Sequence, residues 1–281
     1  MKDHSAAAAM TAAAARQGFP KHPLLFFWFI SVMEETIIRL AGIPVRFLCF
    51  SEKAARFLRR YLPKEEAGEQ EAVFTVDARD MVLSQDDAEL VRTSPYHEYS
   101  HLIESASDAL MTVDRCCLHG AAYVWKERAW ILSAPSGTGK STQYRNLTEL
   151  YGQEIFCING DKPCLEFGAD GTIMVHDSPW RGKEGWGTAG AVYPLAGLFF
   201  LYQADCNEIR EYPPKAGIIP LYHQIFSSRK SEKELRNICR LENILIRNIP
   251  VRFLGNRGDL DSTRLLHGAM EEILEADLSQ N

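Results

Sequence analysis

The stretch SAPSGTGKST, residues 133–142, decides how the rest of the sequence is interpreted. An apolar run, Ala129–Leu132, precedes it, and a segment with helical character follows to about Tyr151. A strand, a glycine-rich turn and a helix in this order form a loop whose successive backbone N–H groups point inward, while the helix N-terminus adds partial positive charge. The stretch therefore predicts a phosphate-binding loop in a domain that mixes strands and helices.

The stretch fits the G-x-x-x-x-G-K-[ST] pattern except at its first position, where Ala134 replaces glycine. In that pattern, Lys140 reaches the outer phosphates of a nucleotide and the Ser141 hydroxyl binds Mg²⁺. An ordinary strand–helix turn is the alternative. The predicted nucleotide-binding residues are consecutive in the chain: Ser136, Gly137, Thr138, Gly139, Lys140, Ser141 and Thr142.

The composition of the 281-residue chain, 46% hydrophobic and 24% charged, is that of a globular protein with one large or two small domains. A formal net charge of −6 argues against a general nucleic-acid binder. The seven cysteines are scattered, without a CxxC pair, and are expected to be reduced in a cytoplasmic protein. The apolar run Leu24–Met33 is shorter than the roughly 20 residues that span a bilayer, so no membrane association is expected, with a weak surface anchor as the alternative.

The sequence divides into three parts. Residues 1–32 begin with an alanine-rich tract and are predicted to be a disordered or misassigned extension. Residues 33–95 hold no cluster of catalytic residue types and predict a small β-rich domain, either structural or substrate-recruiting. Its expected elements are strands at 36–40, 44–50, 72–76 and 81–83 and a helix from Ser51 to about Tyr61. Residues 96–278 carry the phosphate loop and predict the nucleotide-binding domain.

In this last part, a helix is expected from Pro95, and two strands joined by a charged turn at 126–128 are expected to form a hairpin that feeds the loop. The first strand is expected within Cys117–Trp125, so His119 is expected to lie beside the strand that feeds the loop, although a lone histidine is more often a core residue than a catalytic one. The remaining expected elements are strands at 154–158, 192–202 and 250–254, a hairpin at 164–176, and helices at about 214–227, 231–247 and 261–276.

Asp161 follows the strand at 154–158 in the turn Asn159–Pro163. In a strand–loop–helix–strand unit, an acid at the end of the second strand faces the same crevice as the phosphate loop. Asp161 is therefore expected to hold Mg²⁺, directly or through water, or to accept a proton from an attacking hydroxyl. A turn whose carboxylate is merely solvated is the alternative.

The segment 177–187 mixes glycines, charges and two tryptophans, which is too polar for a core and too aromatic for a plain linker. Arg181 and Lys183 are candidates to neutralise phosphate charge in a transition state. Glu184 is a candidate metal ligand. A surface loop pinned by Trp180 is the alternative.

His119-Gly120, the loop at 136–141 and the acidic turn at Asp161, in this order, resemble the C-terminal domain of HPr kinase/phosphorylase. The resemblance covers about residues 110–270. The segments 159–163 and 178–184 are more similar to uncharacterised relatives often found near peptide-modification cassettes. The resemblance implies an α/β fold similar to phosphoenolpyruvate carboxykinase, in which a P-loop domain of mixed sheet and flanking helices follows the small β-rich region.

The resemblance also implies ATP- and Mg²⁺-dependent phosphorylation of a serine hydroxyl on a protein, peptide or small molecule, and a homo-oligomer. Lys140 would bind phosphates, Ser141 would hold Mg²⁺ and Asp161 would act as base. The family usually has two adjacent aspartates in this turn, whereas here the first is Gly160. Either one acid serves both roles or Glu184 shares the work. The implied catalytic residues are Asp161, His119, Arg181 and Lys183, and the implied metal ligands are Ser141, Asp161 and Glu184.

Two other functions are compatible with these residues. The departure at Gly160 is compatible with a nucleotide-binding sensor that has lost turnover. A carboxykinase-like metabolic enzyme is a third interpretation, but the chain is short and has no evident second metal cluster.

Overall fold

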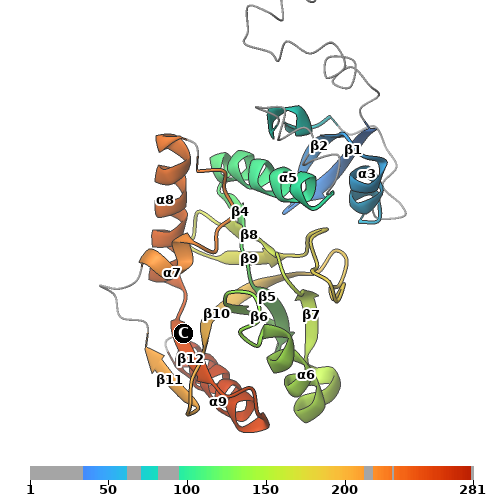
Figure 1. The fold of residues 1–281 in the computed structure, drawn as a ribbon. Helices are drawn as coiled ribbons and strands as arrows, with labels where there is room; N and C mark the ends of the chain where they lie inside the picture. The colour runs from blue at the N-terminus through green and yellow to red at the C-terminus, as the bar shows by residue number, and fades with distance from the viewer. Residues whose placement is uncertain (1–33, 62–70, 82–94, 212–217, 230, 280–281) are drawn as a thin grey trace, which may run out of the picture.

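The computed structural model describes residues 34–61, 71–81, 95–211, 218–229 and 231–279, which form two β-sheets with associated helices (Figure 1). The segments 1–32 and Leu24–Met33, for which an extension and an apolar run were predicted, lie outside the described residues. Among the described residues, no helix combines the length and the apolar character that crossing a membrane requires.

The first sheet has three strands, in the order β1 (Glu34–Leu40), β2 (Ile43–Cys49) and β3 (Phe74–Asp77). β1 and β2 are antiparallel, and β3 joins β2 in parallel. Alternate residues of these strands are buried, as the predicted strand period requires. The small β-containing region expected before the nucleotide-binding domain is therefore present.

Two helices cover the first sheet. α3 (Glu52–Arg59) follows Ser51, where a helix was predicted to start, and the Ser51 hydroxyl caps it by accepting the N–H of Ala54 at 3.1 Å. α5 (Pro95–Leu110) packs Leu102, Ile103 and Ala106 into one core with the sheet and α3. The described residues from Glu34 to Leu110 are called the N-terminal unit below.

The prediction of a strand at 81–83 is wrong for Met81, because this residue is the last one of the 3₁₀ helix η2 (Ala78–Met81). The cause is local: the Asp77 carboxylate accepts the backbone N–H of Arg79 at 2.9 Å and turns the chain away from the sheet. Residues 82 and 83 lie outside the described residues.

The second sheet has nine strands and is mixed. The long strand β10 (Val192–Gln203) lies at its centre. Its first residues pair antiparallel with β9, and its remainder pairs in parallel with β6 and β12. The other strands are β4 (Arg115–Cys117), β5 (Ala121–Trp125), β6 (Arg128–Ser133), β7 (Phe156–Asn159), β8 (Cys164–Phe167), β9 (Ile173–His176), β11 (Glu208–Glu211) and β12 (Val251–Asn256). The predicted α/β class with a mixed sheet is confirmed.

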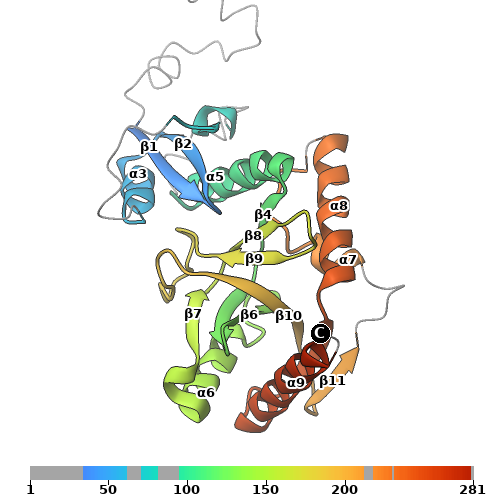
Figure 2. The ribbon, with the colours of Figure 1, turned by 180° about the vertical axis from the view of Figure 1, so that it is seen from behind.

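Helices cover both faces of this sheet (Figures 1 and 2). α6 (Lys140–Tyr151) and α9 (Leu260–Leu278) pack on one face, where they share a core with Tyr123 and Trp125 of β5. The alternate residues of β5, Ala122 and Val124, point into the opposite core, which includes α8 (Glu232–Asn248). The shorter helices are η3 (Met111–Val113), η4 (Gly152–Glu154) and α7 (Ile218–Tyr222).

Most of the predicted elements of this part are present with boundaries shifted by a few residues. The exception is the helix expected at 214–227: residues 214–217 lie outside the described residues, and α7 ends at Tyr222. Beyond it the chain pairs with the segment after β4: Leu118 forms a bridge with Ile225, and Phe226 N donates to Cys117 O at 2.9 Å. Tertiary pairing thus replaces the last helical turns.

Candidate functional site

The phosphate loop connects the end of β6 at Ser133 to the start of α6 at Lys140. Gly137 and Gly139 have φ values of 84° and 116°, in the left-handed region that favours glycine. A Cβ atom at Gly139 would also lie 3.3 Å from the Asn256 side chain, at the end of β12. The strand, turn and helix expected around this stretch are therefore present, and both glycines have a steric reason.

The ammonium group of Lys140 lies against the loop. Its Nζ donates to the carbonyl oxygens of Ala134 at 2.7 Å and Pro135 at 3.4 Å. Burial lowers the pKa of Lys140, and the charge of Asp161 opposes that shift. Ala134 stands where the motif has glycine, and its side chain is buried in the core beneath the loop. Alanine is thus compatible with this loop, since the core accommodates the methyl group of Ala134 and its backbone carbonyl contacts Lys140.

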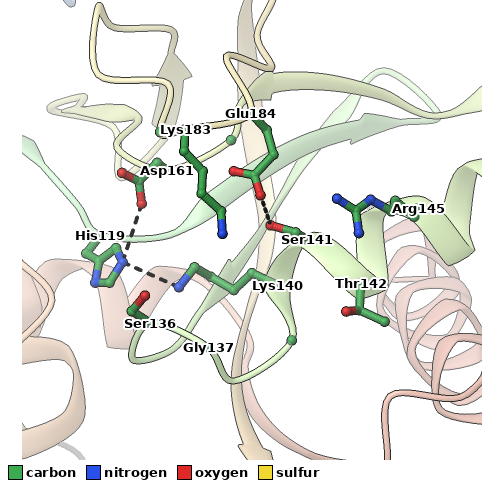
Figure 3. A pocket seen from close by; sticks show the side chains of 13 residues that line it. His119, Ser136, Gly137, Lys140, Ser141, Thr142, Arg145, Asp161, Lys183 and Glu184 are labelled. Atoms are coloured by element: carbon green, nitrogen blue, oxygen red, sulfur yellow. Dashed lines mark hydrogen bonds and ion pairs between the residues drawn. The ribbon is translucent and has the colours of Figure 1, made fainter.

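The loop forms one wall of a pocket of about 440 Å³ (Figure 3). The predicted residues that line it are His119, Ser136, Gly137, Gly139, Lys140, Ser141, Thr142, Asp161, Lys183 and Glu184. Thr138 and Arg181 do not line it, and Arg145, Gly160 and Gly182 line it without having been predicted. Segments that are far apart in the sequence thus converge on one cavity.

Asp161 follows β7 in a turn closed by Asn159, whose Oδ1 accepts the N–H groups of Asp161 and Lys162 at 2.9 and 2.7 Å. Its carboxylate contacts His119 Nε2 at 3.5 Å and forms an ion pair with Lys162. Burial alone would raise the pKa of Asp161, but the hydrogen bond with His119 and the charge of Lys162 lower it to about 2. Asp161 is therefore ionised at neutral pH and faces the pocket.

His119 is a pocket residue rather than a core residue. Its Nε2 lies 3.4 Å from Lys140 Nζ and 3.5 Å from Asp161 Oδ1, so it bridges the phosphate loop and the acidic turn. The backbone N–H of His119 donates to Gln224 O at 2.7 Å. At the next position, Gly120, a Cβ atom would meet Leu132 O at 3.1 Å, which explains glycine there.

Arg181 is engaged outside the pocket. Its Nε donates to both oxygens of Asp177 at 3.1 and 3.2 Å, and its guanidinium lies 5.7 Å from the centre of the Tyr61 ring. Asp177 is buried and also accepts a hydrogen bond from Asn159 Nδ2 at 2.9 Å. Burial raises the pKa of Asp177, and the ion pair with Arg181 opposes the shift. Asp177 thus ties the 177–187 loop to the turn that carries Asp161, and Arg181 pairs with Asp177 from within the same loop.

Trp180 fixes the same loop to the N-terminal unit. Its side chain is buried in the core of that unit, with its ring 6.2 Å from Phe47 and 6.3 Å from Phe57. The predicted alternative, a loop pinned by Trp180, therefore describes part of its structure. The same loop also contacts the pocket: Glu184 Oε1 accepts a hydrogen bond from Ser141 Oγ at 3.3 Å.

The glycines in the acidic turn and the 177–187 loop permit their close contact. Gly182 has a φ of 74°, and a Cβ there would lie 2.9 Å from the Cβ of Asp161. At Gly160, a Cβ would lie 3.2 Å from Arg181 O and 3.3 Å from Trp186 O. An aspartate at position 160 would therefore be crowded, while Glu184 brings a second carboxylate to the pocket from the same loop.

The polar oxygens of the pocket suit a hard divalent cation. Ser141, Asp161 and Glu184 offer one hydroxyl and two carboxylates. In the described part of the chain, no group of three or more His, Cys, Asp or Glu side chains is placed to hold a metal ion by itself. Mg²⁺ is usually bound through one or two carboxylates together with substrate phosphates, and this donor set fits that pattern.

The comparisons with known proteins give no family for the chain: no protein-family model matches the sequence, and no curated protein matches it either. The resemblance to HPr kinase/phosphorylase therefore rests on His119-Gly120, the phosphate loop and the turn at Asp161. These three segments border one pocket.

Proposed function

We propose that the protein is an HPr-kinase-like serine kinase, which transfers the γ-phosphoryl group of ATP, with Mg²⁺, to a serine-like hydroxyl of a protein, peptide or small molecule. The observation that carries the proposal is the convergence of the phosphate loop and an ionised carboxylate, Asp161, on one pocket. Phosphoryl transfer requires mainly positioning and charge neutralisation. Both requirements are addressed by residues that line this pocket. The mixed sheet with parallel β6, β10 and β12 is compatible with the fold of phosphoenolpyruvate carboxykinase.

The donor would bind with its phosphates on the loop. Backbone N–H groups of residues 136–142 and the N-terminus of α6 would hold the phosphate oxygens, and Lys140 would reach the outer phosphates. Lys183 lines the opposite side of the pocket and adds positive charge. Bound Mg²⁺ would supply further charge neutralisation, and Ser141 and Glu184, which are hydrogen-bonded to each other, would hold it together with Asp161 of the same pocket.

Asp161 would orient the acceptor hydroxyl and accept its proton. In the transfer, the acceptor oxygen forms a bond to the γ-phosphorus as the bond from that phosphorus to the β-phosphate oxygen breaks, so ADP leaves and the hydroxyl proton passes to Asp161. His119 touches both Asp161 and Lys140 and would keep the carboxylate beside the phosphate. Arg181 would act indirectly, by holding the loop that carries Lys183 and Glu184.

A nucleotide-binding sensor without turnover is the second candidate. It is favoured by Gly160, which leaves the turn with one acid, and by the ion pair between Lys162 and Asp161. A carboxylate with a pKa of about 2 is a weak base, although it still orients a hydroxyl.

The discriminating experiment measures ATP affinity and phosphoryl transfer in the same preparations. Asp161→Asn should leave the Kd for Mg-ATP within about threefold of the wild-type value and abolish transfer of label from γ-labelled ATP to serine-bearing acceptors in an extract of the source cells. Asp277→Asn, in the last turns of α9 and outside the pocket, is the matched control and should retain transfer. Wild-type protein that binds Mg-ATP and labels no acceptor would favour the sensor.

A further inference from the structure

Arg145 lines the phosphate pocket, but the proposed phosphoryl transfer does not use it. It lies on α6, four residues after Ser141, and residues four apart lie on the same helical face. Its guanidinium reaches from that face toward Ser141 (Figure 3). An arginine so placed adds a second cation to the helix that begins at Lys140.

Aromatic side chains hold this guanidinium in place. It lies 5.5 Å from the centre of the Trp186 ring, a cation–π geometry. Trp186 packs against Tyr144 with ring centres 4.9 Å apart, and Tyr144 stacks on Tyr123 at 4.7 Å. Among the residues that the structure describes, no carboxylate forms an ion pair with Arg145. The pocket therefore contains a positioned guanidinium whose charge is not neutralised by a described side chain.

The pocket has two ends with different residues. His119, Asp161 and the ammonium group of Lys140 lie together on one side of Ser141, and Arg145 lies on the other (Figure 3). In a phosphate loop, the lysine reaches the β- and γ-phosphates, and the backbone N–H groups hold the α- and β-phosphates. A polyphosphate with its terminal group beside Lys140 and Asp161 would therefore extend toward Arg145.

We propose that Arg145, positioned by Trp186, binds the α-phosphate of the donor. This assignment rests on the proposed function and requires a donor with three linked phosphates, as in ATP, because inorganic pyrophosphate would fill only the β and γ positions. A planar guanidinium binds two phosphate oxygens at once, which a lysine does not. The contact with Trp186 limits the orientations of the guanidinium, so less entropy is lost when it binds phosphate.

The test compares the Kd values of Mg-ATP and Mg-pyrophosphate by titration calorimetry for wild type and Arg145→Gln. The substitution should raise the Kd for Mg-ATP by about tenfold or more, which is the effect of losing a charge-assisted hydrogen bond. It should change the Kd of Mg-pyrophosphate by less than about twofold. Trp186→Leu should raise the Kd for Mg-ATP less than Arg145→Gln does, and it should leave the Kd for Mg-pyrophosphate unchanged. Arg236→Gln, on the exposed face of α8, is the control and should change neither.

The failures of the two proposals are distinguishable. If Arg145→Gln weakens the binding of both ligands equally, or of neither, the α-phosphate assignment is overturned while the nucleotide site stands. If the wild-type protein binds neither ligand, the proposed function itself fails. Because Arg145 is exposed, the variant should keep the wild-type melting temperature, and this is checked on the same samples.

Discussion

The phosphate loop and the 177–187 loop face each other across one pocket, but they are held in place by different kinds of contact. The phosphate loop depends on its own glycines and on the strand and helix that flank it. The 177–187 loop depends on residues distant in sequence, since Asp177 accepts a hydrogen bond from Asn159 and Trp180 packs against Phe47 and Phe57. One is encoded locally, and the other depends on two other parts of the chain.

This difference assigns a role to the N-terminal unit. The unit contributes no residue to the lining of the pocket, yet its core contains Trp180, four residues before Glu184. The position of Glu184 next to Ser141 thus depends on packing between the two parts of the molecule. We expect substitutions in that packing to affect Mg²⁺-dependent binding while the phosphate loop keeps its structure.

The largest effect is expected for Trp180→Ala. Removing a buried tryptophan leaves a cavity and should cost about 3–5 kcal/mol of the free energy of unfolding. Urea unfolding measures this loss. Trp180→Phe keeps part of the aromatic packing and should cost less than the alanine variant. A loss below about 1 kcal/mol for Trp180→Ala would show that the N-terminal unit does not hold this loop.

A smaller effect is expected for Gly160→Asp, which adds the acid that the resembling family has at this position. The new Cβ would crowd Arg181 O and Trp186 O, and overpacking of this kind should cost about 1–3 kcal/mol. Thermal unfolding tests it. Gly268→Ala is the control: it lies in α9 with no atom within 4 Å of an added Cβ, and it should stabilise by about 0.5–1 kcal/mol. A fully stable Gly160→Asp variant would contradict the proposed crowding.

The smallest effect is expected at the far end of the phosphate-loop helix. His267 stacks on Tyr151, the last residue of α6, with ring centres 3.7 Å apart. Burial lowers the pKa of His267 below its usual 6.5, although Glu271 opposes the shift. The native state therefore favours the neutral imidazole, so this contribution to stability is present above about pH 6.5 and is lost as the pH falls.

His267→Phe keeps an aromatic ring and removes this titration. The variant should lose less stability than wild type between pH 7.5 and pH 5, measured by urea unfolding at each pH. His176, whose pKa burial also lowers, contributes equally to both proteins and cancels in the comparison. Equal losses of stability in the two proteins would contradict the role assigned to His267.

The same contrast explains what was predictable from the sequence. The phosphate loop, the hairpin of β5 and β6 and the turn at Asp161 have local signals, namely glycine spacing, apolar runs and an Asn-Gly-Asp turn. The pairing of Arg181 with Asp177 was missed, because Asp177 is buried and its other partner, Asn159 of β7, is 18 residues away in the sequence. Arg145 was also missed: an exposed helical arginine usually signals a solvated surface, and only its position four residues after Ser141 distinguished it.

One helix end and two short strands were also not predicted correctly, for different reasons. The helix predicted to reach residue 227 ends at Tyr222 because Ile225 and Phe226 pair with the segment around Leu118. The short strands β4 and β11 were not predicted, since three or four residues with charges carry too little periodicity to identify a strand.

A nucleotide site at the phosphate loop is tested most directly by the melting temperature of wild type and Lys140→Ala, each with and without Mg-ATP. A ligand at about 100 times its Kd adds roughly 2.7 kcal/mol of stability, which raises the melting temperature of a protein of this size by roughly 5–10 °C. We predict this shift for wild type and its loss in Lys140→Ala. A wild-type protein that shows no shift with Mg-ATP, Mg-GTP or Mg-pyrophosphate would contradict a nucleotide site at the phosphate loop.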